Sequence, residues 1–542
     1  MRRSPSENSA VSAPAAPEAG WWRAASIYQI YPRSFQDSNG DGVGDLEGIR
    51  RRLGHLVDLG VDAAWISPFY PSPMHDFGYD VRDYCDVDPL FGSLDDFDRL
   101  LAEAHALGLR VILDFVPNHT SIEHEWFLRG RAGDPDRRDW HIWRDPSPSG
   151  GAPNNWLSHF GGPAWTFDET RGQYYHHAFL PQQPDLNWRN PAVKAAMLDV
   201  LRFWLRRGVD GFRVDVISQI VKDEQFRDNP ENPDWTQERP EIERRLQLYS
   251  GDRPEVHALV AEMRAVLEEF GHGVLIGEIY LPPERLVAYY GEALRGAHLP
   301  FNFQLLETPW EAGALGAMIE AYEALLPQGA WPNWVLSNHD RPRVAARVGS
   351  AQARVAAMLL MTLRGTPTLY YGDEIGIGPV EVPPERVRDP WALREPHLSV
   401  GRDPVRTPMQ WDASANAGFS QAEPWLPLTP DWAARNVATQ ARDPCSMLSL
   451  TRALLALRKA SRCLTLGSWR RLDAPAGVLA YERAFADERR LVALNLSAAP
   501  KLWTPPAGEA LEIALSTTLA RAGEKVGAQL ALQPDEGVIL LA

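Results

Sequence analysis

Residues 191–216 read PAVKAAMLDVLRFWLRRGVDGFRVDV, and this stretch decides the fold. In its first part, Val193, Met197, Leu201 and Trp204 recur at the spacing of one face of an α-helix. Gly208 follows as a helix-ending residue. Residues 209–216 are then a short, mostly apolar run of strand length. A helix that leads through a glycine into such a strand is typical of a parallel α/β sheet.

The same alternation recurs along the chain and predicts eight strands. Because strands that alternate with helices form parallel sheets, eight units predict an α/β fold with a closed (β/α)8 TIM barrel. A doubly wound open sheet is the alternative, which the lack of a glycine-rich phosphate loop after the first strand disfavours. The predicted strands are residues 27–31, 61–67, 109–116, 209–216, 273–279, 301–306, 334–338 and 368–372.

Two segments depart from this rhythm. Residues 118–190 show little helical periodicity but hold six Trp and six His. A structureless loop of that length is uncommon, so we expect an inserted subdomain after the third strand. After residue 464 the helical pattern gives way to short strands, which predicts a C-terminal all-β sandwich domain over 465–542. The barrel then spans 21–117 and 191–464, and the Ser-, Ala- and Pro-rich residues 1–20 form a disordered tail.

Composition narrows the classes of partner. The 542 residues carry 55 basic and 71 acidic side chains, a net charge of −16, which disfavours nucleic acid or an anionic membrane as partner. No apolar run approaches the roughly 18–20 residues of a membrane span, and three scattered cysteines argue against a disulfide scaffold. The first residues lack the apolar core of a signal peptide, so we expect a cytoplasmic protein. The sequence makes no prediction of oligomeric state.

Acidic residues recur where the predicted strands end. Asp215 ends the fourth strand two residues after Arg213, Glu278 ends the fifth, and Asp340 follows the seventh. Any one of these carboxylates could simply cap the helix that follows it. Three of them at the same end of one barrel favour a catalytic site. A pair of carboxylates that flank a bond is the arrangement for glycoside hydrolysis. Arg213 favours the ionised form of Asp215, as a nucleophile requires, and the apolar run around Glu278 favours its protonated form, as a general acid requires.

Five short strings resemble motifs of the α-amylase family of retaining glycoside hydrolases, family 13, and most closely its oligo-1,6-glucosidase and α-glucosidase branch. The resemblance covers roughly residues 21–542, and the strings stand in the order and at the spacing of the family. They are DFVPNH (114–119), QPDLNW (183–188), GFRVDV (211–216), GEIY (277–280) and SNHD (337–340).

The resemblance implies a role for each catalytic position. Asp215 is expected to be the nucleophile that forms a covalent glucosyl-enzyme, and Glu278 the acid that later activates water. Asp340 is expected to stabilise the transition state. The resemblance also implies that Arg213 orients Asp215, and that His119 and His339 hydrogen-bond the glucose hydroxyls. For both histidines a purely structural role stays open.

The resemblance further implies a closed end to the sugar site. Asp80, in FGYDVRDY (77–84), is expected to hold hydroxyls of the terminal sugar, with Tyr79 as a stacking platform. Arg402, in GRDPVRTPMQW (401–411), is expected to close the pocket with Asp80, although a plain salt bridge is the alternative. Such a clamp predicts release of single glucose units from chain ends. Phe160 and Phe179 are expected either to wall the pocket or only to pack.

A further motif, DSNGDGVGD (37–45), resembles a calcium loop. Its oxygen donors occupy alternate positions, as in the first part of an oxygen-ligand calcium site, but the twelfth position is glycine instead of glutamate, so it is no EF-hand. The alternative is a turn rich in Asp, Asn and Gly. The resemblance supports a structural Ca²⁺ and no organic cofactor. The expected ligands are Asp37, Asn39, Asp41, the Val43 carbonyl and Asp45.

Together these features predict an exo-acting retaining α-glucosidase for short oligosaccharides or disaccharides. In the branch that the chain resembles, the residue after the nucleophile is said to sort linkages, and Val216 resembles enzymes that accept α-1,6 bonds. Two alternatives stay open. The first is a transglucosylase or a sucrose or trehalose isomerase on the same scaffold, and the second is a non-catalytic binding protein of this fold.

Overall fold

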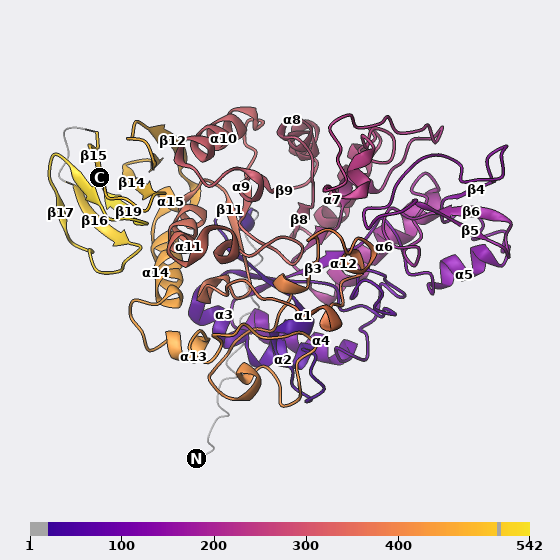
Figure 1. Ribbon diagram of the computed structural model, residues 1–542, viewed down its shortest axis with the longest axis horizontal. Helices are drawn as coiled ribbons and strands as arrows, with labels where there is room; N and C mark the ends of the chain where they lie inside the picture. Colours follow the sequence, from indigo (N-terminus) through magenta and orange to yellow (C-terminus); the bar gives the residue numbers. More distant parts are fainter. Residues whose placement is uncertain (1–19, 507–510) are drawn as a thin grey trace, which may run out of the picture.

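The computed structural model describes residues 20–506 and 511–542, and eight parallel strands at its centre close into a barrel (Figure 1). Neighbours around the ring follow the order β1-β11-β10-β9-β8-β7-β3-β2. The predicted (β/α)8 barrel is therefore confirmed. The strands are β1 (Ile27–Ile30), β2 (Ala63–Ile66), β3 (Arg110–Phe115), β7 (Gly211–Val214), β8 (Val274–Gly277), β9 (Leu299–Asn302), β10 (Asn333–Val335) and β11 (Thr366–Tyr370).

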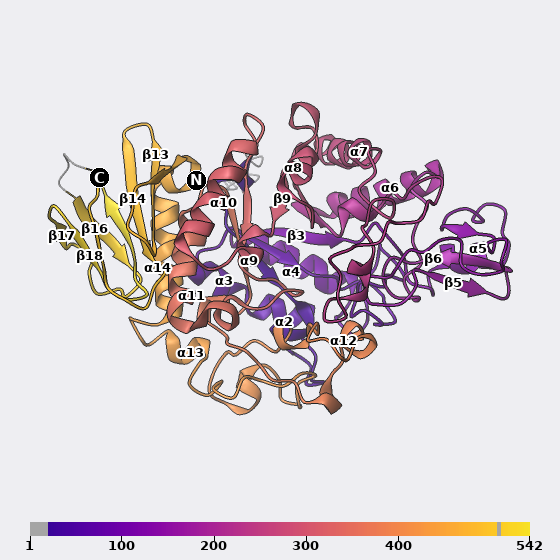
Figure 2. The same cartoon turned by 45° about the horizontal axis from the view of Figure 1, so that its top comes forward.

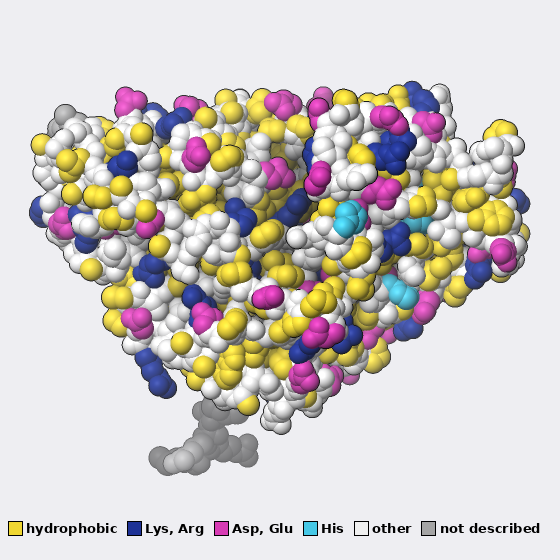
Figure 3. Space-filling view, viewed as in Figure 1, with side chains coloured by type: hydrophobic (Ala, Val, Ile, Leu, Met, Phe, Trp, Pro, Cys, Tyr) yellow, Lys and Arg dark blue, Asp and Glu magenta, His cyan; other side chains and the backbone are white. Residues whose placement is uncertain are grey.

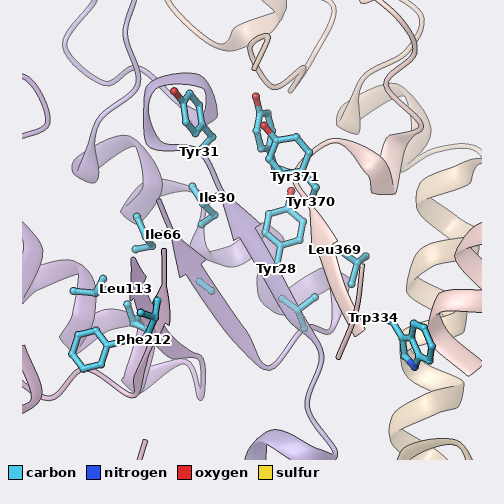
Figure 4. Packing of buried hydrophobic residues seen from close by; sticks show 14 of the residues in the cluster. Tyr28, Ile30, Tyr31, Ile66, Leu113, Phe212, Trp334, Leu369, Tyr370 and Tyr371 are labelled. Atoms are coloured by element: carbon cyan, nitrogen blue, oxygen red, sulfur yellow. The ribbon is translucent and has the colours of Figure 1, made fainter. Parts of the chain in front are cut away.

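The ring closes because β1 pairs in parallel on both sides. Ile27 is in register with Ala63 of β2 and with Thr368 of β11. Every residue of β1, β2, β7, β8, β9, β10 and β11 is buried, as expected of strands that helices cover on the outside and side chains fill on the inside. Figure 4 shows Tyr28 and Ile30 of β1 between Ile66 of β2 and Leu369 of β11.

Helices cover the barrel, and their ends follow the sequence. α6 (Pro191–Arg207) begins at Asn190, whose side chain accepts a hydrogen bond from the Ala192 amide, and ends at Gly208 with φ 103°. α4 (Leu94–Ala106) begins with a capping box between Ser93 and Asp96. The other main helices are α2 (Leu46–Arg51), α3 (Leu53–Leu59), α7 (Val256–Glu269), α10 (Ala312–Leu325), α11 (Val344–Thr362) and α14 (Met447–Ala460).

The sixth strand differs from its prediction. We expected residues 301–306, whereas β9 runs over Leu299–Asn302 and the short helix α9 (Gln304–Glu307) follows at once. The Asn302 side chain accepts a hydrogen bond from the Gln304 amide and thereby turns the chain out of the strand. An apolar run of this length fits strand or helix equally well, so periodicity alone placed the boundary wrongly.

The chain between β3 and α6 forms an antiparallel sheet of its own at one end of the molecule (Figures 1 and 2). It contains α5 (Glu125–Arg131), β4 (Trp143–Arg144), β5 (Trp165–Asp168) and β6 (Gln173–His176), with strand order β4-β6-β5. Phe127, Trp143 and Tyr175 form a small core there. The exact limits of the predicted subdomain, 118 and 190, stay a prediction.

Two antiparallel sheets at the opposite end complete the molecule (Figures 1 and 2). Their own core joins Ala480, Ala493, Trp503 and Leu540, which confirms the predicted C-terminal all-β part. The six-stranded sheet has the order β12-β13-β14-β19-β16-β17, and β15 pairs with β18. The strands are β12 (Ser468–Leu472), β13 (Val478–Phe485), β14 (Glu488–Asn495), β15 (Lys501–Trp503), β16 (Leu511–Ser516), β17 (Lys525–Val526), β18 (Leu530–Leu532) and β19 (Gly537–Leu541).

Acidic, basic and apolar side chains are interspersed over the face shown in Figure 3. Across residues 20–506 and 511–542, no helix combines the length and the apolar character that a bilayer crossing requires. The predicted tail, apart from Gly20, lies outside the described residues.

Candidate active site

The carboxyl ends of the barrel strands bring the predicted catalytic residues into one cavity of about 710 Å³. Asp215 directly follows β7, Glu278 directly follows β8, and Asp340 lies on the loop after β10. In a (β/α)8 barrel this is the end where active sites form. The cavity is also lined by most of the predicted sugar contacts, namely Tyr79, His119, Phe160, Phe179, His339 and Arg402.

One guanidinium joins three buried carboxylates at the base of the cavity. Arg213 Nη1 lies 2.6 Å from Asp114 Oδ1 and 2.7 Å from Asp215 Oδ1, and its Nη2 lies 2.7 Å from Glu278 Oε2. The Val216 amide also donates to Glu278 Oε2 at 3.0 Å. Both carboxylates of the predicted pair are therefore held by the same short segment, Arg213 to Val216. Within it Val216 has φ 35°, a left-handed conformation that is strained for a β-branched residue.

The balance of charge at Asp215 differs from our expectation. Burial raises the pKa of Asp215 well above its ordinary value; Arg213 opposes this rise, while repulsion from Glu278 and Asp114 adds to it. Burial likewise raises the pKa of Asp114 to about 6 despite Arg213. The sequence argument counted the adjacent arginine but not the second and third carboxylates. The single guanidinium of Arg213 therefore faces three carboxylates, and a cluster of this kind retains a proton more readily than a lone carboxylate does.

Asp340 is the opposite case. Burial alone would raise the pKa of Asp340, but the interaction with His339 and the positive charges of Arg402, Arg406 and Arg213 together hold it well below its usual range. Arg406 Nη2 lies 2.9 Å and Arg402 Nη1 3.3 Å from Asp340 Oδ1. Asp340 therefore stays ionised beside a group that favours a proton, which is the separation of states that acid–base chemistry needs.

The two predicted histidines are buried, and burial lowers the pKa of each, so both rings are neutral. His339 approaches Gln29 Nε2 at 2.8 Å through Nδ1 and the Tyr79 hydroxyl at 2.6 Å through Nε2. The Tyr79 ring stacks on His339 at 5.3 Å and 4°, so one face of the expected sugar platform is already covered. His119 Nε2 lies 3.0 Å from the Tyr79 carbonyl.

The predicted Asp80–Arg402 clamp is corrected to Asp76–Arg402. The Asp80 carboxylate accepts hydrogen bonds from Ser72 Oγ and from the His75 and Asp76 amides, and burial raises its pKa to about 6. It thus folds the local loop, whereas Asp76 lines the cavity and its Oδ1 lies 2.7 Å from Arg402 Nη2. Arg402 also pairs with Asp389 at 2.7 Å.

Aromatic rings complete this end of the cavity. The Arg402 guanidinium lies 4.8 Å from the centre of the Phe160 ring, and Phe160 contacts Phe179 at 5.6 Å and Trp391 at 5.9 Å. The structure therefore places Phe160 and Phe179 in the cavity wall, one of the two roles that the sequence left open.

Sequence reasoning missed four charged residues of this site: Asp76, Asp114, Asp389 and Arg406. Asp114 and Arg406 stand inside strings that were quoted, but no spacing rule gave them a role. Asp76 and Asp80 are four residues apart in one loop, where no periodicity tells which of the two points inward. Asp76, which directly precedes FGYDVRDY (77–84), and Asp389 lie outside every quoted string.

In the predicted calcium loop, the carboxylate oxygens mainly accept hydrogen bonds from backbone amides of the loop itself. Asp37 accepts hydrogen bonds from the Asn39, Gly40 and Gly42 amides, and Asp45 from the Ser38 and Gly48 amides. Asp45 is thereby the N-cap of α2. Over the described ranges, no three His, Cys, Asp or Glu side chains converge closely enough to hold a metal ion.

A carboxylate cluster at the carboxyl end of a (β/α)8 barrel, beside neutral histidines and a closed, arginine-capped pocket, defines a glycoside hydrolase. Residues 29–467 match the family model described as "Alpha amylase, catalytic domain". The chain therefore belongs to the α-amylase family.

Similar proteins cover nearly the whole chain. A "Probable alpha-glucosidase" of Rhizobium meliloti is 43% identical over 510 residues, which cover 90% of this chain and 92% of the relative. An "Oligo-1,6-glucosidase" of Parageobacillus thermoglucosidasius is 37% identical over 519 residues, 89% and 91% of the two chains. The crystal structure of an alpha-glucosyl transfer enzyme, XgtA, matches with a TM-score of 0.92 and 42% identity, covering 97% of this chain and all of that one.

Proposed function

We propose that the chain is a retaining, exo-acting α-glucosidase that releases terminal glucose from short α-glucosides, α-1,6-linked ones among them. The observation that carries the proposal is the closed end of the cavity, where Arg402 pairs with Asp76, Asp389 and Asp340. A pocket closed behind one sugar ring admits a chain end but not the middle of a chain. The α-glucosidase and oligo-1,6-glucosidase relatives support this substrate class.

In the first half of the reaction, an Asp215 oxygen attacks the anomeric carbon and forms a glucosyl ester. Glu278 gives its proton to the glycosidic oxygen as that bond breaks, so the leaving group departs as a neutral alcohol. Arg213 contacts both carboxylates and stabilises Asp215 in its ionised form. Asp340, held ionised by Arg402 and Arg406, stabilises the positive charge that develops on the sugar ring.

In the second half, Glu278 is ionised and accepts a proton from water. The oxygen of that water attacks the anomeric carbon, the ester to Asp215 breaks, and glucose leaves with its original configuration. Asp215 returns to its ionised form and Glu278 to its protonated form. Retention requires the two carboxyl groups to lie about 5–5.5 Å apart, which a structure with bound inhibitor would measure.

A substrate panel tests the proposal. We expect only glucose from isomaltose and maltose, and glucose together with a chain one residue shorter from a maltooligosaccharide, with no internal cleavage of the longer chain. Asp215→Ala should lose at least about 10³-fold in kcat, because the nucleophile is absent. Asp139→Ala removes an exposed carboxylate elsewhere and serves as the control. Full activity of Asp215→Ala, or first products of the longer chain that have lost two or more glucose units in one cut, would contradict the proposal.

Val216 provides a separate prediction on linkage. It lines the cavity directly after Asp215, so its side chain borders the bond to be cleaved. Replacing Val216 with Thr should shift the ratio of kcat/KM for isomaltose over maltose towards maltose. An unchanged ratio would contradict a role of this side chain in linkage preference.

Glucosyl transfer is the second candidate, and the likeness to XgtA over the whole chain favours it. Transfer uses the same covalent intermediate and differs only in whether water or a sugar hydroxyl attacks it. At high maltose concentration, the amounts of free glucose and of trisaccharide distinguish the two activities. A trisaccharide excess over net hydrolysis would make transfer the main activity.

We further propose that the loop 37–45 binds a structural Ca²⁺. The donor chemistry fits, because Ca²⁺ takes carboxylate, amide and carbonyl oxygens, and the loop offers three Asp, one Asn and the Val43 carbonyl. Because the acidic side chains of the loop do not converge on one point, the Asn39 side chain and the Val43 carbonyl would have to complete the set of Ca²⁺ ligands. Such an ion would hold the turn that enters α2 and would take no part in the chemistry.

A chelator should therefore lower the melting temperature of the enzyme, and added Ca²⁺ should restore it, because an ion that binds only the folded chain stabilises it. Asp41→Asn should weaken the response to Ca²⁺, whereas Asp95→Asn on the exposed start of α4 should not. If neither the chelator nor added Ca²⁺ changes the melting temperature, the loop is a turn that binds no structural ion.

A further inference from the structure

One positive charge in the cavity has no carboxylate partner. Arg341 lines the cavity directly after Asp340, and over the described residues no carboxylate oxygen lies within 4 Å of its guanidinium. Tyr280, through its charge interaction and a hydrogen bond, and more weakly Asp340 and Glu307 from beyond 4 Å raise the pKa of Arg341, so the guanidinium stays charged. No carboxylate pairs with it at close range, and an anionic ligand group would gain a charge-assisted hydrogen bond there.

Aromatic rings hold this guanidinium in place. It lies 4.6 Å from the centre of the Tyr280 ring, and that ring stacks on Phe303 at 4.2 Å and 6°. A backbone bridge between Asn338 and Arg341 fixes the turn that carries it. An arginine that lies on an aromatic face keeps N–H donors at its planar edge available for an anion. The side chain is therefore preorganised for binding.

Arg341 lies on the side of the cavity where the leaving group must be. Asp76 and Arg402, which close the glucose end, are 4% and 6% exposed, whereas Tyr280 is 36% exposed. Tyr280 is two residues beyond Glu278, the group proposed to protonate the glycosidic oxygen. The open end next to Glu278 therefore receives the part of the substrate that leaves.

The other charges on this side are already matched. Asp252 pairs with Arg285, and Glu243 pairs with Arg239. Arg343, which is 1% exposed, lies 3.6 Å from Asp373 Oδ1 and donates to the backbone carbonyls of Tyr371 and Val405. Among the described residues that line the open end, Arg341 alone brings a charge without an ion pair.

We propose that Arg341 binds an anionic group, a carboxylate or a phosphate ester, on the leaving-group side of the substrate. The enzyme then prefers α-glucosides with an acidic leaving group over matched neutral ones. This inference rests on the proposed α-glucosidase activity and names its substrate class more closely. No bond to Arg341 forms or breaks during the reaction.

Two matched substrate pairs test the inference. Maltobionate and maltitol differ by a carboxylate in place of a hydroxymethyl group on the open-chain leaving group. Trehalose 6-phosphate and trehalose test the phosphate source. We expect kcat/KM to favour the acidic member of at least one pair by about tenfold or more, the factor that one charged hydrogen bond supplies.

Variants at Arg341 connect any such preference to this side chain. Arg341→Gln should reduce the acidic-to-neutral ratio of kcat/KM about tenfold, and Arg341→Lys should restore much of it by returning the charge. Arg99→Gln, a matched change on exposed α4, should leave the ratio as it is. In the unaltered enzyme, raising the ionic strength from 0.01 M to 1 M should also reduce the ratio, because the Debye length falls from about 30 Å to 3 Å.

The outcomes separate this inference from the proposed function. If none of the four substrates nor maltose yields glucose, the α-glucosidase proposal itself fails. If glucose is released but both ratios are near one or below, or if the ratio survives in Arg341→Gln and in high salt, the role of Arg341 is overturned. A preference for one acidic member that falls in Arg341→Gln supports it and identifies carboxylate or phosphate.

Discussion

At the scale of single residues, the pKa of each carboxylate in the site depends on how many arginines contact it. Arg213 contacts Asp114, Asp215 and Glu278 at once, whereas Asp340 has two arginines of its own. The same residue type therefore has opposite pKa shifts a short distance apart, raised at Asp215 and lowered at Asp340. This contrast leads to a prediction for the pH dependence of activity.

Asp114→Asn should move the acid limb of kcat/KM to lower pH. The reaction requires ionised Asp215, whose pKa is raised by burial and, in part, by repulsion from Asp114. Removing that negative charge lowers the pKa of Asp215, so activity persists to lower pH, by about one pH unit. Because the carboxylates titrate together, the profile reports the cluster and not one residue.

The measurement is a full pH profile of kcat/KM for both enzymes, with Asp95→Asn as the control on exposed α4. The absolute rate of the Asp114 variant is not the test, since Asp114 also accepts hydrogen bonds from Trp65 and Tyr79. An acid limb that stays in place or moves to higher pH would show that Asp114 does not repel Asp215.

Prediction of single residues from the sequence succeeded where regular backbone structure determines the direction in which a side chain points. Arg213 and Asp215 are two apart across a strand end, so they face the same way, and both reach the cavity base. It failed for Asp80, because inward and outward positions in the loop 72–80 depend on turns that leave no period. The partners of Arg402 come from the distant loops that carry Asp76 and Asp389, which only the folded chain brings together.

At the scale of elements, a buried ion pair joins the sheet β4-β6-β5 to the barrel. Lys222 Nζ lies 2.5 Å from Asp185 Oδ2 and 2.6 Å from Asn118 Oδ1, and it also donates to the Gln219 carbonyl. Asp185 in turn contacts His176 Nδ1 at 2.9 Å. The loops after β3, β6 and β7 therefore meet at one charge pair.

Asp185→Asn should destabilise the protein by about 3–5 kcal/mol, because it leaves the Lys222 ammonium buried without a counter-charge. Adding Lys222→Met should recover part of this loss. In the folded chain Lys222 and His176 hold the pKa of Asp185 below its ordinary value, in spite of its burial. The stabilisation is therefore complete above about pH 4 and is lost as the pH falls further.

Thermal melting of the single and double variants checks this prediction. We expect the single Asp185 variant to melt lowest, with the double variant between it and the unaltered protein. If Asp185→Asn melts with the unaltered protein, the pair does not hold the loops together.

At the scale of the whole molecule, two buried arginines attach the C-terminal sheets to the barrel. Arg483 of β13 donates to the carbonyls of Thr362, Gly467 and Ser468, and Arg458 of α14 donates to Met361, Leu464 and Gly365. Met361 and Thr362 belong to the last turn of α11, whose carbonyls have no partner within the helix. Burial lowers the pKa of Arg483 to about 10 and that of Arg458 to about 9.

Arg483→Met should therefore cost about 3–5 kcal/mol of stability, since it leaves several buried carbonyls without donors. We expect limited proteolysis to cut first near residue 467, where the barrel meets β12. Arg470→Met, on the exposed side of β12, serves as the control. Equal melting temperatures and cleavage rates in both variants would contradict a role of Arg483 in the attachment.

The architecture itself was predictable because its signals are local and repeated. Each strand has its own apolar run, and helices such as α4, α6 and α14 have their own N-caps. An error at one boundary, such as that of β9, therefore does not change the predicted number of strands. The distribution of charge was less predictable, because partners such as Thr362 and Arg483 lie 121 residues apart.

The pairing of β1 with β11 has a consequence for synthesis. Ile27 and Thr368 stand in register, so roughly 340 residues must be made before the first strand meets its second neighbour. At about 5–20 residues per second, the edge of β1 stays open for about 20–70 s on the ribosome. Gln29 and its partner His339 are 310 residues apart, so a nascent chain lacks a complete sugar pocket for nearly as long. An unpaired strand edge favours aggregation, and slow translation of the chain between β1 and β11 would prolong that exposure.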